Sequence, residues 1–418
     1  MSGPVQSSPS PPSPGSHIPI LDGIRGLAVA LVMVHHFFAD SLPAETAFDH
    51  AIFSAMHTGW CGVDLFFVLS GYLITGILYD TKGGRNYFQN FYARRTVRIF
   101  PLYYAMLFLF FVLMPLVDHP EIQDYVREAE PDQLWFWAYL TNVQVALRGS
   151  FYPELIPNLT WSLAIEEQFY LVWPLVVLLA SRRTVMRICI GLVVVALGLR
   201  VALAANGTKW VVAYVFTPAR LDCLAIGAFL ALYFRGSYRP NVVVLAKRTL
   251  LLCLILVSAF AAHAGTLDQR NPLIYTLGFT GIALCFGSML VLAVTAPRDK
   301  PHGTSARRLV DNGFMRTLGK YSYALYLCHG PVATGVRLLY HPRRQPLYFG
   351  SSIPRTLIYV GLTVLASLAV ALLSWHLLEK HFLKLKRFFP SERAATPEEE
   401  RRAAGLTPAL DPPRQAGD

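Results

Sequence analysis

The sequence predicts an all-α, polytopic transmembrane helical bundle of about ten spans, with both termini in the cytoplasm. Its composition is the first indication, because 54% of the 418 residues are hydrophobic and only 15% are charged, whereas a soluble domain has roughly 25% charged residues. The second indication is that the apolar residues form runs of about 15 to 22, enough to cross a hydrocarbon core of ~30 Å. The third is the distribution of Lys and Arg between these runs.

The apolar runs, taken in order, define the predicted spans. They are residues 24–40, 60–79, 99–117, 160–180, 188–204, 219–234, 249–264, 272–295, 317–340 and 354–378. Residues 134–147 (LWFWAYLTNVQVAL) fit either an interfacial segment or an eleventh span. Three regions follow: a disordered Ser- and Pro-rich arm (1–19), the transmembrane domain (20–384), and a charged, disordered cytoplasmic tail (385–418).

The distribution of charge predicts how the chain is oriented in the membrane and which classes of partner it has. The loops after even-numbered spans carry clustered Lys and Arg, while the first two loops on the other side are acidic, which places the basic loops in the cytoplasm. The net charge of +11 is therefore interpreted as a topology signal, and the lipid bilayer is expected as a partner rather than a nucleic acid. The six cysteines lack metal-ligand spacing, so we expect no metal and treat them as small apolar residues.

The first span, LDGIRGLAVALVMVHHFFAD, carries ionisable groups that are costly in lipid. Arg25 and His36 are eleven residues apart, which is within ~20° of three helical turns and a rise of ~16 Å. They therefore share one face, with Arg25 at the cytoplasmic boundary and His36 about half-way across. An arginine at the cytoplasmic boundary suits an anionic donor, and an imidazole half-way across suits a general base. The alternative is that Arg25 reaches lipid headgroups and that His36 is a hydrogen-bonded packing residue. His35 points about 100° away from His36 on the helix, and we expect it to be a supporting residue.

Three arginines lie in one helical turn of FYARRTVRIFPLYY, just inside the cytoplasmic face. Arg95 and Arg98 are spaced i,i+3, and Arg94 shares a face with Arg98. Their guanidinium groups can address one phosphate together, so we expect them to bind a phosphorylated ligand. The alternative explanation is the positive-inside rule combined with anionic lipid.

The fourth span opens with NLTWSLAIEEQFYLVWPL, in which Glu166 and Glu167 follow the pair Trp161 and Ser162. A carboxylate at this depth must face a polar cavity or pair with a cation. It can orient an imidazole or accept from a hydroxyl, and we predict a catalytic role for Glu167 or Glu166. An interhelical ion pair with Arg220 is the alternative.

Other polar residues in predicted spans are weaker site candidates. Asp64 and Ser70 occur in an apolar, Gly-containing helix where packing through Gly71 and Gly76 is the default interpretation. Arg220 and Asp222 diverge on one helix and are expected to pair with other helices. Tyr326 and His329 lie one turn apart, on a shared face.

These blocks resemble the acyltransferase type 3 family of membrane O-acyltransferases over about residues 18–383. LDGIRGLAV with its downstream His is similar to the first-helix motif of that family, which implies Arg25 and His36 as the essential pair. GVDLFFVLSGYLITG, FYARRTVRIFPLYY, WSLAIEEQFYLVWP, RLDCLAIGAFLA and YSYALYLCHGPV resemble its further blocks. Cys328 and Gly330 stand where the family often has tryptophans. We expect no esterase-like domain after the membrane part, in which case a second transfer step would need a separate partner.

The resemblance implies an enzyme, an acyltransferase that transfers groups other than aminoacyl groups, in the bacterial inner (plasma) membrane. Its donor would be cytoplasmic acyl-CoA, with acetyl-CoA expected. Its acceptor would be a hydroxyl of a glycan, a lipid-linked sugar or a glycosylated small molecule, as in O-acetylation of cell-envelope carbohydrate. His36 would act either as the base or as the first acyl carrier. The rival hypotheses are a proton-coupled secondary transporter and a scaffold or receptor.

Overall fold

The computed structural model describes residues 18–39, 44–152, 158–236, 241–264, 267–296, 308 and 310–390. Within these ranges the chain is helical, with no strand and one isolated bridge between Tyr348 and Ser351. The all-α polytopic prediction is therefore confirmed. The long helices are α1 (Pro19–Ala39), α3 (Gly62–Asp80), α4 (Tyr87–Phe108), α9 (Thr160–Leu179), α10 (Arg182–Ala205), α12 (Thr217–Tyr233), α13 (Asn241–Ala264), α14 (Phe279–Thr295), α17 (Ser322–Leu339) and α18 (Ile353–Ser374).

Shorter elements connect or extend the long helices. The short α-helices are α2 (Ala47–His57), α5 (Pro120–Ala129), α6 (Gln133–Trp137), α7 (Thr141–Arg148), α11 (Trp210–Val215), α16 (Gly313–Lys320) and α19 (Lys380–Leu383). The 3₁₀ and π segments are η1 (Thr58–Cys61), η2 (Leu109–Leu113), η3 (Met114–Leu116), η4 (Glu130–Asp132), η5 (Ile274–Gly278), η6 (Pro342–Arg344), η7 (Trp375–Glu379) and η8 (Lys384–Phe388).

Nine helical stretches of the described ranges are long and apolar enough to cross a membrane. They are Pro19–Phe38, Ala47–Asp80, Tyr87–Leu116, Thr160–Leu179, Arg182–Ala205, Trp210–Tyr233, Asn241–His263, Ile274–Thr295 and Ile353–Phe388. Each overlaps a predicted span. The remaining prediction, 317–340, is split at Tyr321 into α16 and α17. Helix α17 has 18 residues, but His329, Pro331 and Arg337 make it less apolar than these nine.

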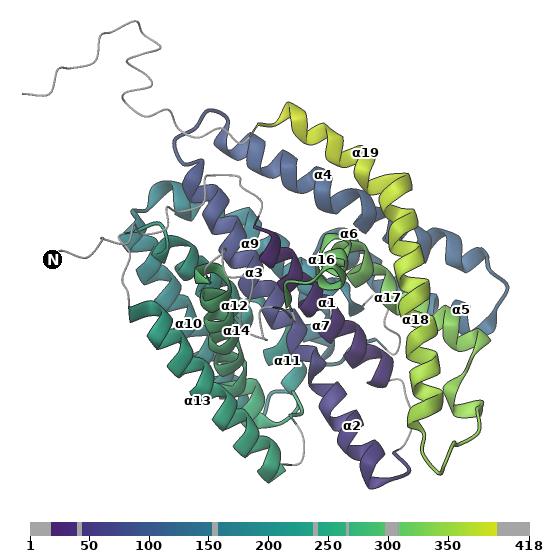
Figure 1. Cartoon of the computed structure of the whole chain (residues 1–418). Helices are drawn as coiled ribbons and strands as arrows, with labels where there is room; N and C mark the ends of the chain where they lie inside the picture. Colours follow the sequence, from purple (N-terminus) through teal and green to yellow (C-terminus); the bar gives the residue numbers. More distant parts are fainter. Residues whose placement is uncertain are drawn as a thin grey trace, which may run out of the picture.

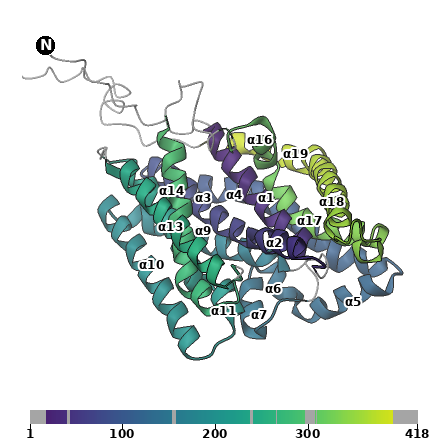
Figure 2. The same ribbon diagram turned by 60° about the horizontal axis from the view of Figure 1, so that its bottom comes forward.

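The segment 134–147 does not form an eleventh span. It is divided between α6, with five residues, and α7, with eight, and a helix needs about 20 residues to cross the bilayer. Tyr139 between them has a positive φ of 55°, a conformation that interrupts a helix. Figure 2 shows α6 and α7 as short helices below the bundle, next to α11.

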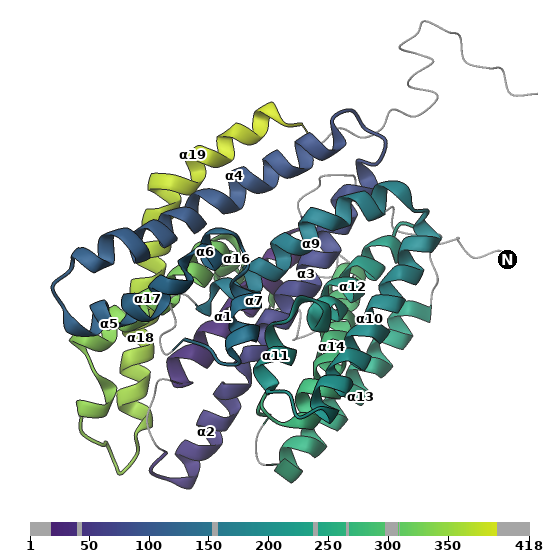
Figure 3. The same cartoon turned by 180° about the vertical axis from the view of Figure 1, so that it is seen from behind.

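Helices α1, α3, α9 and α12 form the centre of the bundle (Figures 1 and 3). The span containing α3 is 72% buried by the rest of the protein, whereas the spans of α10 and α13 are 17% and 11% buried. Helix α3 packs against α12, α1, α9 and α14, and α13 contacts α14 at the edge. The outer helices therefore present apolar surface to lipid, and polar groups gather around α3.

Glycines allow the central helices to approach closely, as predicted for Gly71. A Cβ atom at Gly71 would overlap the carbonyl of Leu224, and one at Gly227 would overlap the carbonyl of Val68, so α3 and α12 meet backbone to backbone. Helix α1 is held in the same way, because Gly319 of α16 faces the carbonyl of Asp22. Such contacts are typical of membrane helix pairs, and they fix the helix that carries Arg25 and His36.

The predicted boundary between transmembrane domain and tail falls inside helical structure. The last span continues from α18 through η7 and α19 into η8, which ends at Phe388. Arg94 of α4 donates to the carbonyl of Phe389 at 2.9 Å, so residues predicted as disordered from 385 pack on α4. The rest of the predicted tail, 391–418, and nearly all of the predicted arm, 1–17, lie outside the described residues.

Candidate active site

A cavity of about 110 Å³ lies within the bundle between α1, α3, α4, α9 and α17. One part of its wall is apolar, chiefly from α3, and the rest is polar. The polar lining residues are Arg25, Ser70, Arg95, Arg98, Ser162, Glu166, Tyr170, Ser322, Tyr323 and Tyr326. A concave space with a few convergent polar groups is the usual form of a ligand site.

Three arginines from two helices meet in this cavity, and two of them, Arg95 and Arg98, belong to the turn that the sequence predicted to bind a phosphorylated ligand. Arg25 of α1 pairs with Asp22 at 3.4 Å and keeps 26% of its side chain exposed. Arg95 of α4 lies over the ring of Tyr170 at 5.5 Å, and Arg98 is within electrostatic range of both other arginines. Arg94, by contrast, turns toward Phe389 and a separate small pocket. The structure therefore separates Arg94 from the other three.

Sequence reasoning missed a fourth cation, Lys386 of η8. This half-buried lysine lies within electrostatic range of Arg98, Arg95, Arg94 and Arg25. The carboxylates close to these cations are Asp22, Glu166 and Glu379, and they are fewer than the cations. The available signal is the basic run KLKRF at residues 384–388, at the predicted boundary between the transmembrane domain and the tail.

The two adjacent glutamates have different surroundings. Glu166 lines the cavity, beside Ser70 and Tyr170 and within electrostatic range of Arg95 and Arg25. Ser70 and Tyr170 are themselves hydrogen-bonded through their hydroxyl groups at 2.5 Å. Glu167 does not line this cavity, and its buried Oε1 has no hydrogen-bond partner among the described residues. Glu166 is thus the carboxylate that accompanies the arginines.

Glu167 faces a group of tyrosines on the other side of α9. It lies within electrostatic range of Tyr103, Tyr139 and Tyr323. The two glutamates diverge because successive residues of an α-helix are separated by about 100°. The carboxylate of Glu167 is therefore among phenol groups, and of the cavity arginines it is within electrostatic range of Arg95.

Two histidines lie just beyond the inner end of the cavity. The hydroxyls of Ser162 and Tyr326 are 2.5 Å apart at that end, and the rings of Tyr326 and His329 have centroids 6.0 Å apart. His329 Nε2 is in turn 3.0 Å from His36 Nδ1. His36 is not among the residues that line the cavity. The arginines and His36 are therefore connected through Tyr326 and His329, rather than by one open space.

His35 is turned away from this pair, as expected from its place on the helix. Its Nδ1 donates to the carbonyl of His57 at 2.7 Å, and its ring meets that of His36 edge to face, with centroids 5.1 Å apart. His35 is buried and joins α1 to the end of α2. It supports the packing around His36.

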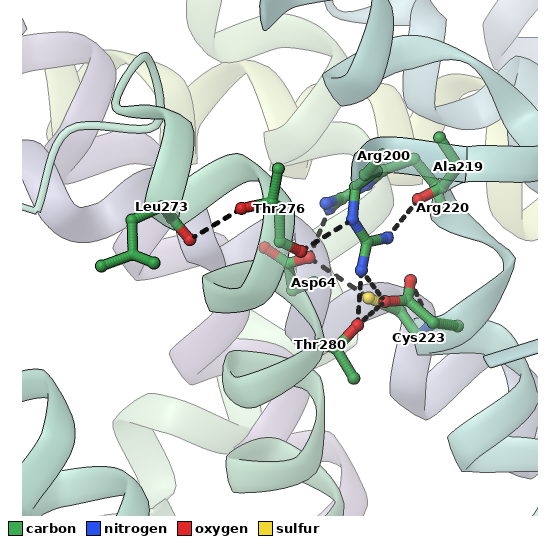
Figure 4. A network of polar contacts seen from close by, with 9 residues as sticks. Asp64, Arg200, Ala219, Arg220, Cys223, Leu273, Thr276 and Thr280 are labelled. Carbon is green, nitrogen blue, oxygen red and sulfur yellow. Dashed lines mark hydrogen bonds and ion pairs between the residues drawn. The ribbon is translucent and has the colours of Figure 1, made fainter. Parts of the chain in front are cut away.

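The other candidate residues belong to a separate buried network (Figure 4). Asp64 of α3 forms an ion pair with Arg220 of α12, and Arg200 of α10 pairs with Asp222 at 2.9 Å. All four side chains are completely buried. Arg220 and Asp222 thus pair with other helices, as predicted, whereas the alternative pairing of Arg220 with a glutamate of α9 is not found. Sequence reasoning missed Arg200, although an arginine inside an apolar span was a usable signal.

Neither this network nor Trp161 contributes to the cavity lining. Thr280 of α14 donates to Asp222 at 2.7 Å, and Cys223 donates to Asp64 at 3.2 Å. The guanidinium of Arg220 stacks on the ring of Phe279 at 4.4 Å. Trp161 packs against Tyr214, with ring centroids 4.7 Å apart. These residues connect α3, α9, α10, α12 and α14.

The fold and cavity define a polytopic α-helical integral membrane protein with a cationic cavity inside its bundle. The family model of the type 3 acyltransferase domain matches residues 18–373. The chain therefore belongs to this acyltransferase family, as the sequence motifs indicated. No solved structure matches the chain.

Curated relatives are bacterial proteins named as O-acetyltransferases. The peptidoglycan O-acetyltransferase OatA of Listeria monocytogenes is 29% identical over 339 residues, covering 76% of this chain and 50% of that protein. The O-acetyltransferase OatA of Staphylococcus aureus is 29% identical over 348 residues, covering 79% of this chain and 53% of that protein. The chain thus spans about half the length of the curated relatives it matches.

Proposed function

We propose that the protein is a membrane O-acetyltransferase that moves an acetyl group from acetyl-CoA to a hydroxyl of a cell-envelope carbohydrate. The observation that carries this proposal is the single cavity lined by Arg25, Arg95, Arg98 and Glu166. Arginine side chains bind phosphate through paired, charge-assisted hydrogen bonds. Their convergence from two helices suits a phosphorylated donor better than a topology signal, for which scattered surface cations would be sufficient.

The donor is assigned to the arginine end of the cavity. Arg25, Arg95 and Arg98, together with Lys386, are suited to the phosphates of the coenzyme. The apolar wall from α3 suits the extended arm that carries the thioester. To approach His36, the thioester has to pass the hydrogen-bonded pair Ser162 and Tyr326, so the Tyr326 side chain must move during transfer.

The chemistry is assigned to His36. The acceptor hydroxyl transfers its proton to a ring nitrogen of His36 as its oxygen attacks the thioester carbonyl. A carbon–oxygen bond forms, the carbon–sulfur bond breaks, and the electron pair leaves with the coenzyme sulfur. The proton then passes from His36 to that thiolate, which gives free thiol and restores the neutral imidazole. A route in which His36 first carries the acetyl group needs the same free ring nitrogen.

The acceptor is proposed from the relatives, because the Listeria monocytogenes protein is named as a peptidoglycan O-acetyltransferase and the Staphylococcus aureus protein as an O-acetyltransferase. A sugar hydroxyl that enters from the side opposite the arginines would meet His36, which is partly exposed. We therefore propose peptidoglycan or another envelope glycan as the acceptor class.

The decisive experiment follows labelled acetyl-CoA. Membranes that contain the protein are incubated with acetyl-labelled donor and isolated peptidoglycan fragments, and ester-linked label is measured. The His36→Ala variant should lose transfer by roughly 10²-fold or more, which is the usual contribution of a general base. The control His263→Ala, at an exposed position on α13, should match the wild type. Full turnover by His36→Ala, or uptake of a solute without any acetylated product, would contradict the proposal.

A further inference from the structure

The imidazoles of His36 and His329 form a hydrogen-bonded chain between two backbone carbonyls. His329 Nδ1 is 3.0 Å from the carbonyl oxygen of Leu325, and His329 Nε2 is 3.0 Å from His36 Nδ1. His36 Nδ1 is also 3.0 Å from the carbonyl oxygen of Val32. The chain thus begins and ends at groups that only accept hydrogen bonds.

This arrangement decides where each proton lies in neutral imidazoles. A carbonyl oxygen has no proton, so His329 Nδ1 must carry one and donate it to Leu325. The other nitrogen of His329 is then an acceptor, and His36 Nδ1 must carry the proton shared between His329 and Val32. His36 Nε2 is left without a proton and with a free lone pair. That is the state that a general base or nucleophile needs.

The other groups near His36 do not fix its tautomer in the way that His329 does. His35 meets it edge to face, and the Nδ1 of His35 is occupied by the carbonyl of His57. Asp268 acts on His35 and His57, and Arg270 acts on His57, whereas the charged or titratable groups that act on His36 are His329 and His35. Among the described residues no carboxylate is hydrogen-bonded to His36. In serine proteases an aspartate holds the tautomer of the catalytic histidine, whereas here a second imidazole occupies that place.

We propose that His329 is a positioning residue that fixes the tautomer and ring orientation of His36, so that Nε2 is free to act on the acceptor hydroxyl. This inference rests on the proposed function, in which His36 is the reacting imidazole. It also explains why His329 is completely buried and lies between the cavity and His36. When His36 accepts a proton, its Nδ1–H remains bound to an acceptor, so the charged intermediate keeps its partner.

Two substitutions at His329 separate an acceptor role from a packing role. His329→Leu keeps most of the volume and removes the acceptor, while His329→Gln offers an amide oxygen to His36 Nδ1. We expect His329→Leu to lower kcat by roughly 10²-fold and His329→Gln to remain within about tenfold of wild type. KM for the acetyl donor should stay unchanged in both variants, because neither touches the arginines. His263→Leu on α13 serves as the control.

Nitrogen-15 NMR of imidazole-labelled protein in bilayers provides a readout that packing alone would not change. The His36 signals, assigned by their loss in His36→Ala, should show a protonated Nδ1 and an unprotonated Nε2 in the wild type. His329→Leu should abolish this preference. A protonated Nε2 on wild-type His36, or equal kcat losses for the Leu and Gln variants with donor binding intact, would overturn the proposal.

The two proposals fail in different ways. If His36→Ala turns over normally, the assignment of the reacting imidazole is wrong, and with it the proposed mechanism. If His36→Ala is inactive while His329→Leu transfers at the wild-type rate, only the positioning role is wrong. If both variants are inactive and His329→Gln recovers transfer, both proposals are supported.

Discussion

At the scale of single residues, neighbours in sequence have different chemistry because a helix turns them to different surroundings. Glu166 faces the arginine-lined cavity, while Glu167 lies among tyrosines with one carboxylate oxygen unpaired. From the sequence, both glutamates are candidates for the same role, and which of the two faces the site could not be predicted. The choice depends on how α9 is rotated against α3 and α4, which is a property of packing.

This difference predicts unequal effects of the two glutamine substitutions. Glu166→Gln removes the negative charge beside Arg95 and Arg25 and should lower kcat/KM for the donor by about 10- to 100-fold, because the two guanidinium groups lose a charge-assisted contact worth ~1.5–3 kcal/mol that holds them in place. Glu167→Gln replaces an unpaired buried carboxylate by a neutral amide and should leave kcat/KM within a few-fold of wild type. Steady-state transfer of labelled acetyl tests both, and a greater loss for Glu167→Gln would reverse the assignment.

The cationic residues predict graded losses of donor affinity. Arg95→Ala should weaken acetyl-CoA binding by about 10- to 100-fold, as expected for a hydrogen bond to a charged group worth ~1.5–3 kcal/mol. Lys386→Ala should weaken it less, because a lysine acts as a flexible point charge. Lys384→Ala, at an exposed position in the same segment, is the matched control. Donor titration by calorimetry in detergent measures all three, and unchanged affinity for Arg95→Ala would exclude it from the donor site.

At the scale of elements, the sequence located most spans, since a bilayer requires long apolar helices. It could not decide where polarity and length conflicted. The segment 134–147 was left open between an interfacial segment and a span, and the structure breaks it at Tyr139, while the predicted span 317–340 is divided at Tyr321. Helix breaks that are stabilised by tertiary contacts leave no clear periodic signal.

The close contact of α3 with α12 predicts a stability effect. Gly71→Ala places a methyl group against the backbone of Leu224 and should destabilise the protein by about 1–3 kcal/mol, the usual cost of overpacking. Gly198→Ala on α10, where a Cβ atom meets nothing within 4 Å, should be neutral or stabilising, because alanine favours helix by about 1 kcal/mol over glycine. Thermal unfolding in detergent compares them, and equal midpoints would show that α3 and α12 can separate at little cost.

At the scale of the whole molecule, two buried ion pairs connect three helices. Asp64 with Arg220 and Arg200 with Asp222 join α3, α10 and α12, and the hydrogen bond from Thr280 to Asp222 adds α14 to this network (Figure 4). Asp64→Asn leaves Arg220 buried without its countercharge and should cost about 3–5 kcal/mol. The double variant Asp64→Leu with Arg220→Met removes both charges and should recover much of the loss. Folded yield by fluorescence-detected chromatography tests this, and a double variant as unstable as the single one would argue against a charge effect.

The network and the cavity have separate tasks within the bundle. The ion pairs lie around α12, away from the cavity lining, and hold the helices that support α3. The cavity lies on the other side of α3, where α1, α4, α9 and α17 meet. Asp64, Arg220 and Asp222 were candidate site residues because ionisable groups in spans are so often functional. Their complete burial in pairs indicates a structural role.

The sequence by itself determined the membrane character, the approximate spans, the acyltransferase family and the placement of Arg95 and Arg98 in one helical turn, because hydropathy, charge and local spacing are properties of the chain. Only the tertiary structure decided that Arg25 meets Arg95 and Arg98, that Glu166 faces the cavity, that Lys386 joins the arginines, and that His329 lies between the cavity and His36. These relations join residues up to 361 positions apart, from Arg25 to Lys386. Helical periodicity relates residues within one helix, whereas the packing of several helices sets which faces meet.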